Sequence, residues 1–307
     1  MASARRRSGS LRRVRPWFWA GALCLLAVGF VLWRWSAGSK PATSSPSGVA
    51  VELNPPRDLE QHSPTMEPEP PPVTVPAGTA GKVAIVIDDL GRSLVVVEEL
   101  FSIGADLSYS VLPYESRTSE VVARLVALDA EILCHLPMEA DEASDPGPGA
   151  LQSSMTSPEL AAATRAALAA VPGAVGVNNH MGSVLTENRL AMRAVLEVLG
   201  AEDLFFLDSR TTAGSVGYSL ARELDLAAVE RKVFLDRERS VRAIQSEFRR
   251  LLALAAAGEQ AVAIGHPYPE TRQVLRAEIP RAVALGYRFV RVSELFEAGL
   301  EAAAAPM

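Results

Sequence analysis

The chain has 307 residues, a formal net charge of −6 and an uneven charge distribution. Residues 1–40 carry eight basic residues and no acid, which leaves −14 for the rest and argues against a nucleic-acid-binding surface there, while neutral glycans and peptides remain acceptable partners. The two cysteines, Cys24 and Cys134, lie in segments of different character, so no disulfide framework is expected.

The apolar run from Trp17 to Trp33 is uncharged, follows an arginine cluster and has tryptophans at both edges, as membrane-interface belts do. Residues 1–37 are therefore predicted to form a cytoplasmic basic segment and a single-pass transmembrane signal-anchor helix in the inner membrane. The folded domain would then lie in the periplasm. The alternative is a signal peptide cleaved near residues 36–38, which would release a secreted domain.

Residues 38–80 are predicted to be a disordered linker, because ten prolines lie between positions 41 and 80 and periodic apolar residues are almost absent. Such a segment would hold the following domain away from the membrane. That domain is expected to span residues 81–300, with a short tail at 301–307.

From Lys82 onward, short apolar runs alternate with helical patterns, which predicts an α/β fold with a parallel sheet flanked by helices. Helix starts are expected at Ser157, Thr186 and Ser240, from their capping side chains. The strand-like runs cover residues 83–89, 107–113, 131–139, 174–180, 204–210, 232–236, 261–267 and 287–293.

Polar residues gather where these runs end, and they favour a (β/α) barrel over an open doubly wound sheet. In a barrel, the carboxyl ends of the strands ring one mouth, whereas an open sheet would spread them along an edge. The expectation is a TIM-like barrel of seven to eight parallel strands with outer helices. The residues concerned are Asp88, Asp89, His135, Asn178, Asn179, His180, Asp208, Asp236 and His266.

Three histidines of the expected domain each end a strand-like run, whereas His62 lies in the linker and is expected to be idle. One such histidine alone would satisfy a local hydrogen bond. Together with an aspartate from the first strand, His135 and His180 would provide the three protein ligands of a catalytic zinc site. His266 would be either a general acid or a third imidazole ligand.

Asp88 and Asp89 directly follow a buried strand. Adjacent strand residues point to opposite faces, so one carboxylate would bind a cation while the other takes a proton from an attacking water. The residues alone do not assign the two roles. By the same alternation, Cys134 beside His135 is expected to be a core residue and not a nucleophile.

Five motifs over about residues 82–296 resemble the divergent polysaccharide deacetylase family. They are IDDLG at 87–91, HLPME at 135–139, GVNNHMGS at 176–183, FLDSRT at 206–211 and GHP at 265–267. The resemblance implies a distorted (β/α) barrel that removes acetyl groups from chitin-like or peptidoglycan sugars. It also implies that Asp88 is the base, Asp89 a metal ligand and His266 the general acid.

The chain departs from the parent deacetylases because it has no His-x-x-x-His segment, and Glu139 stands four residues after His135. The second imidazole ligand is therefore expected to be His180 from another strand. Substrate binding is predicted for Asn178, Asn179, Ser183, Asp208 and Arg210.

The leading hypothesis is a metal-dependent hydrolase, with Zn²⁺ or a similar divalent cation, acting on an acetylated or amide-bearing envelope glycan such as peptidoglycan. The alternative is a catalytically silent barrel that binds a glycan or an envelope protein. A metal-dependent peptidase or amidase is a third possibility.

Overall fold

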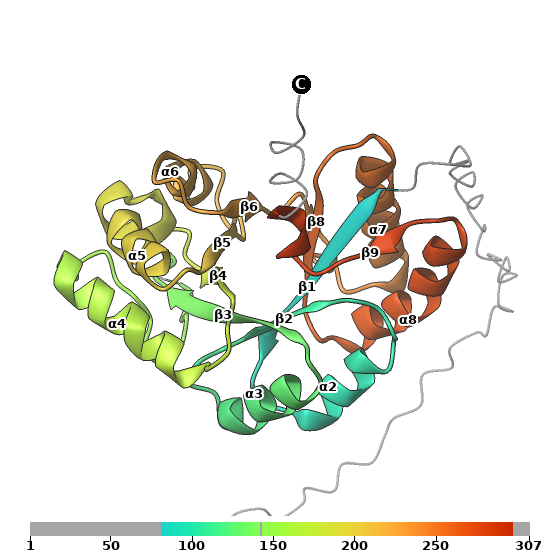
Figure 1. Cartoon of the computed structure of the whole chain (residues 1–307), viewed down its shortest axis with the longest axis horizontal. Helices are drawn as coiled ribbons and strands as arrows, with labels where there is room; N and C mark the ends of the chain where they lie inside the picture. The colour runs from blue at the N-terminus through green and yellow to red at the C-terminus, as the bar shows by residue number, and fades with distance from the viewer. Residues whose placement is uncertain (1–80, 142, 297–307) are drawn as a thin grey trace, which may run out of the picture. The chain divides into compact units, whose positions relative to one another are not determined.

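A computed structural model describes residues 81–141 and 143–296, and these residues contain a nine-stranded, entirely parallel sheet (Figure 1). The hydrogen-bonded order is β6-β5-β4-β3-β2-β1-β8-β7, and β9 pairs with the start of β1. The strands are β1 (Lys82–Leu90), β2 (Ser108–Val111), β3 (Glu131–Met138), β4 (Gly176–Met181), β5 (Phe205–Asp208), β6 (Ala228–Glu230), β7 (Val233–Phe234), β8 (Ala261–Gly265) and β9 (Arg288–Phe289).

The sheet curls into a half-barrel, and Figure 1 shows the helices arranged around its outside. The expected distorted (β/α) barrel is confirmed, and the open doubly wound sheet was the wrong alternative. The helices are α2 (Leu94–Phe101), α3 (Thr118–Ala127), α4 (Ser157–Ala170), the 3₁₀ helix η1 (Leu185–Glu187), α5 (Arg189–Ala201), α6 (Gly217–Glu223), α7 (Val241–Ala256) and α8 (Pro269–Ala284).

The barrel is not closed by hydrogen bonds, because β6 and β7 are the two ends of the strand order. Only Arg231 and Lys232 separate these strands in the chain. The amide of Arg231 donates to Asp208 O of β5, and the amide of Lys232 donates to Val262 O of β8. The edges of β6 and β7 are therefore joined by the covalent chain and not by hydrogen bonds to each other.

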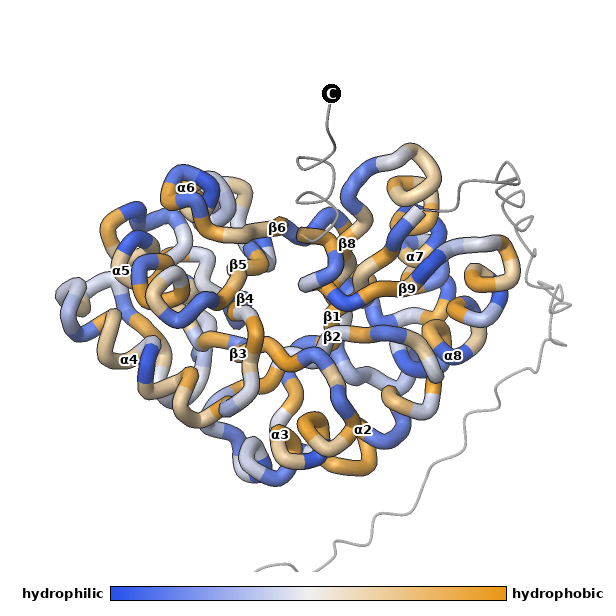
Figure 2. Tube along the Cα trace, viewed as in Figure 1, coloured by the Kyte–Doolittle hydropathy of each residue, from blue (hydrophilic) through white to orange (hydrophobic). Residues whose placement is uncertain are grey.

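Strand alternation divides the sheet into an outer face against the helices and an inner face. The outer face includes Ile85, Ile87 and Cys134, all fully buried in the larger apolar cluster, which confirms the core position expected for Cys134. The inner face includes Val86 and Leu133, which belong to a second, smaller cluster. Figure 2 shows this apolar character along much of the sheet.

The helix starts differ in part from the expectation. Ser240 caps α7 as predicted, accepting a hydrogen bond from Ala243 N at 3.2 Å. Helix α4 is instead capped by Thr156, in a capping box with Glu159, so Ser157 is its first helical residue. Asn188, and not Thr186, caps α5, because a 3₁₀ turn intervenes.

Several predicted features fall outside the described residues: the basic segment, the span Trp17–Trp33, the linker to residue 80 with His62, and the tail at 301–307. Within the described part of the chain, every helix is too short or too polar to cross a bilayer.

Candidate metal centre

The inner face of the sheet carries polar residues at the carboxyl ends of several strands. Leu133 of β3 is followed two positions later by His135, which pairs in register with Asn178 of β4. His180 lies two positions after Asn178, so the three side chains share one face. On β8 the same alternation leads from Ile264 to His266. The fold thus brings residues from distant segments to one mouth of the half-barrel.

The aspartate pair departs from the simple alternation expected for it. The pairing of β1 with β2 shifts register between Ile87 and Leu90, which places one extra residue in β1 at this point. Asp89 also has a left-handed backbone, with φ of 56°. The expectation that the two carboxylates face opposite ways is therefore wrong. Asp88 Oδ2 and Asp89 Oδ1 lie 3.5 Å and 3.3 Å from the same atom, His135 Nε2.

Asp89, His135 and His180 form a triangle of potential ligand atoms. His180 Nδ1 is 3.1 Å from His135 Nε2 and 3.1 Å from Asp89 Oδ1, and the third side measures 3.3 Å. Zinc held tetrahedrally by N and O ligands at about 2.0–2.1 Å requires separations of about 3.3 Å. Asp89 Oδ1 is also buried and has no hydrogen-bond partner in the described structure. The spacing, the donor types and this unpartnered oxygen all fit a divalent cation.

Asn178 is fully buried, and its side chain contacts His135 of this triangle and the neighbouring Asp88. Its amide nitrogen donates to Asp88 Oδ1 at 2.9 Å and to Ser209 Oγ at 3.3 Å. Its amide oxygen accepts from Ser110 Oγ at 2.5 Å and lies 3.1 Å from His135 Nδ1. Because that oxygen can only accept, His135 must carry its proton on Nδ1. The lone pair of Nε2 is then left for a cation.

His266 is held by Asp236, a buried residue that follows β7. Asp236 Oδ1 lies 2.9 Å from His266 Nδ1, while Oδ2 accepts from His266 N at 2.5 Å and from Thr271 Oγ1 at 2.7 Å. This arrangement turns His266 Nε2 toward the cleft, where it lies 3.8 Å from Asp89 Oδ2.

The cluster of carboxylates and imidazoles shifts several pKa values. Burial opposes ionisation of Asp89, but His135 and His180 beside it hold the pKa of that carboxyl well below its usual range. Burial likewise opposes protonation of His135 and His266. Asp88 and Asp89 nevertheless raise the pKa of His135, and Asp236 with the same two aspartates raises that of His266.

A cleft of about 380 Å³ opens over these residues, and Arg231, Phe234, Arg237 and Tyr268 line its wall. Of the predicted substrate-binding residues, Asn179 and Arg210 also line it, whereas Ser183 is not among the lining residues. Several of the predicted residues form hydrogen bonds within the protein. The Asn179 side chain donates to Met181 O and accepts from Ser209 N. Substrate binding by any of them stays a prediction.

Asp208 also has a structural role. Its carboxylate is fully buried and accepts from Ser215 Oγ at 2.7 Å, Tyr218 N at 3.0 Å and Arg210 N at 2.8 Å. These hydrogen bonds connect the start of α6 to the end of β5.

Sequence reasoning placed Asp236 at a strand end but gave it no role, and it did not single out Ser110, Arg231 or Arg237. The run Leu235-Asp236-Arg237 after a strand was a usable signal for the Asp236 carboxylate. Ser110 had no signal of its own, because its role depends on the register between β2, β3 and β4.

Comparison with known families matches residues 85–296 to a model described as divergent polysaccharide deacetylase. The chain belongs to this family. The matched segment contains Asp88, Asp89, His135, His180 and His266, and thus the whole candidate metal centre.

Two bacterial relatives support the same assignment. The protein YibQ of Escherichia coli (strain K12) is 36% identical over 197 residues, which cover 64% of this chain and 62% of YibQ. A Haemophilus influenzae protein is 33% identical over 196 residues, covering 64% of this chain and 70% of the relative. The matched region thus spans less than two thirds of YibQ.

Among solved structures, the protein ATU2773 from Agrobacterium tumefaciens C58 superimposes with a TM-score of 0.67 at 21% identity, over 71% of this chain and 90% of that chain. At this identity the similarity concerns the fold alone. It supports the half-barrel architecture of the chain.

Proposed function

We propose that the protein is a metal-dependent hydrolase of the deacetylase kind, acting on an acetylated or amide-bearing envelope glycan. The observation that carries the proposal is the triangle of Asp89, His135 and His180 ligand atoms, with sides of 3.1–3.3 Å. One corner of this triangle is Asp89 Oδ1, a buried carboxylate oxygen that lacks a hydrogen-bond partner in the described structure. Membership of the family supports a glycan as the substrate.

Asp89, His135 and His180 would hold the cation, with Zn²⁺ as the proposed metal because imidazole and carboxylate are typical zinc ligands. When bound, such a cation lowers the pKa of a coordinated water and polarises a carbonyl group. The triangle supports Asp89 over Asp88 as the ligand, since Asp88 is not part of it.

Asp88 would serve as the general base. Its Oδ1 accepts a hydrogen bond from the Asn178 amide. Its Oδ2 faces the His135 side of the cleft and would accept a proton from an attacking water. Asn178 fixes the orientation of both the base and one metal ligand, so it acts as a positioning residue.

His266 would serve as the general acid. Asp236 and the two aspartates of the site raise its pKa, and the Asp236 carboxylate holds Nδ1 so that Nε2–H points into the cleft. A proton on Nε2 is then available to a leaving amine or alkoxide. The same cleft would thus hold a general base, Asp88, and a general acid, His266.

The proposed cellular setting rests on the sequence. The arginine cluster and the span Trp17–Trp33 support an inner-membrane anchor with the folded domain in the periplasm, where envelope glycans occur.

Metal content and turnover test the proposal together. The purified protein is expected to bind about one equivalent of Zn²⁺ and to release acetate from N-acetylated chitin oligosaccharides or peptidoglycan, and both properties should be lost with a chelator. His180→Ala should abolish stoichiometric metal, whereas His62→Ala, a change at the histidine expected to be idle, should not. Asp88→Asn should retain metal and lose turnover. Glycan binding that survives chelation, without turnover in the metal-loaded protein, would contradict the hydrolase and point to a binding barrel.

A further inference from the structure

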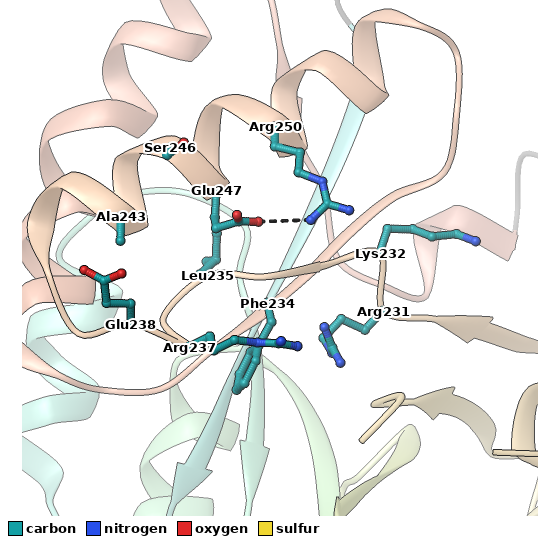
Figure 3. A pocket seen from close by; sticks show the side chains of 10 residues that line it. All are labelled: Arg231, Lys232, Phe234, Leu235, Arg237, Glu238, Ala243, Ser246, Glu247 and Arg250. Carbon is teal, nitrogen blue, oxygen red and sulfur yellow. Dashed lines mark hydrogen bonds and ion pairs between the residues drawn. The ribbon is translucent and has the colours of Figure 1, made fainter. Parts of the chain in front are cut away.

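A second cleft, of about 550 Å³, adjoins the one over the metal centre. The two share Arg231, Phe234 and Arg237 in their linings, so they meet along one wall. The second cleft runs between the segment that follows β6 and the helix α7, and Figure 3 shows Ala243, Ser246, Glu247 and Arg250 of α7 along one side.

Basic side chains dominate this region, although the chain beyond residue 40 is strongly acidic. Two of the four basic residues lining the second cleft have acidic partners nearby. Lys232 Nζ is 2.6 Å from Glu230 Oε1, and Arg250 Nη1 is 3.2 Å from Glu247 Oε2. Their charge is largely balanced, so the excess positive charge lies on the other two residues, Arg231 and Arg237.

Arg231 and Arg237 have no carboxylate partner within ion-pair distance in the described part of the chain. Arg231 donates to two backbone carbonyls, Ser209 O at 2.6 Å and Arg210 O at 2.7 Å. Its guanidinium also lies over the Phe234 ring, 4.9 Å from the ring centroid, but no carboxylate balances its charge directly. Arg237 forms neither a hydrogen bond nor an ion pair with any described residue. Figure 3 shows its side chain extending toward Arg231 in front of Phe234.

The positive charges of Arg231 and Arg237 repel each other. Burial lowers the pKa of Arg231, and the charge of Arg237 lowers it further. The carboxylates that attract Arg231 from a distance, Asp88 and Asp208, already accept hydrogen bonds from Asn178 and from the start of α6. Two arginines that point toward each other without an acid between them are suited to binding an anion, since a guanidinium binds carboxylate and phosphate oxygens through paired N–H donors.

We propose that the substrate is an anionic glycan, whose carboxylate or phosphate lies between Arg231 and Arg237 while its acetyl or amide group reaches the metal centre. The inference rests on the proposed function and narrows its substrate class. Because the arginines line the wall shared by the two clefts, the anionic group would lie on the same sugar unit as the reacting group or on the next one.

The test measures binding without turnover, in the full-length metal-loaded protein carrying Asp88→Asn. Two matched ligand pairs distinguish the sources of the anion. The first is a peptidoglycan disaccharide with a free muramic acid carboxylate against its methyl ester. The second is N-acetylglucosamine 6-phosphate against N-acetylglucosamine. Dissociation constants are measured by calorimetry at two salt concentrations.

The anionic member of at least one pair is expected to bind about tenfold more tightly, with the preference reduced at high salt. Arg237→Gln should remove that preference without weakening the neutral ligand. Arg193→Gln is the control, because it makes the same charge change at an exposed ion pair with Glu197 on α5. Arg237 is chosen over Arg231 because Arg231 also holds the backbone after β5.

Equal binding of both members of each pair, absence of binding by all four ligands, or a preference that Arg237→Gln leaves unchanged would overturn the inference. The proposed function fails on different measurements, namely metal content and acetate release. A protein that binds zinc and deacetylates neutral oligosaccharides without an anionic preference would therefore refute the inference alone.

Discussion

Replacement of Asn178 by alanine tests whether the metal centre depends on its buried support. The side chain makes contacts with Ser110, His135, Asp88 and Ser209, and all four of its hydrogen-bonding positions are used. In Asn178→Ala, the His135 ring loses the acceptor that fixes its tautomer, and Asp88 loses its amide donor. Both ligand and base would then be free to reorient.

The expected loss in metal affinity is 10–100-fold, or about 1.4–2.7 kcal/mol, as is typical for removal of a group that orients a metal ligand. The free energy of unfolding should fall as well, by about 3 kcal/mol, because buried polar groups lose their partners. The two effects are separable, since one is read from competition with a chromophoric chelator and the other from denaturant unfolding of the metal-free protein.

Asn188→Ala is the matched control. Asn188 caps α5, accepting from Leu190 N and Ala191 N, so its loss should cost about 1 kcal/mol of stability and leave metal affinity unchanged. If Asn178→Ala bound zinc within threefold of the wild-type affinity while losing stability, orientation of His135 by Asn178 would be irrelevant to the site. The reasoning from its hydrogen bonds would then be refuted.

Three further predictions concern other parts of the chain. Asp89→Asn should fold normally, because asparagine tolerates the left-handed backbone, but should lose at least 10-fold in zinc affinity; retention of wild-type affinity would exclude the ligand role. Glu131→Ala should lower the free energy of unfolding by about 3 kcal/mol or more, since the buried carboxylate accepts from Ser108 Oγ, Val292 N and Ser293 N, and chemical denaturation measures the change. Burial raises the pKa of Cys134 to about 12, so the reactive thiolate is scarce below that pH. Alkylation followed by peptide mass spectrometry should find Cys134 unmodified at pH 8.5 in the folded protein and labelled after unfolding. Rapid labelling of the folded protein would contradict this prediction.

The strand pattern predicted most of the fold because its period is independent of tertiary context. It placed Cys134 in the core and His135 among the polar residues at one mouth of the barrel, and the structure shows both. It did not detect β6, because three residues, Ala228–Glu230, are too few to display a period. Helix starts shifted by one or two residues where a second capping side chain, Thr156 or Asn188, stood nearby.

The site was less accessible to sequence reasoning wherever it depends on backbone dihedral angles or register. The histidines were found because each ends an apolar run. The orientation of Asp89 was missed because a register shift and a positive φ are tertiary outcomes, not properties of the two aspartates. Asn178 was expected to contact substrate. Its bonds to Ser110 and His135 follow only from the alignment of three strands.

The edges of β6 and β7 do not pair with each other, and the chain crosses between them through Arg231 and Lys232 alone. In a fully closed barrel, backbone hydrogen bonds between two strands would occupy this position. Here a connecting residue, Arg231, forms part of the wall over the metal centre. A substitution at position 231 therefore alters the wall of the cleft without interrupting a ladder between β6 and β7.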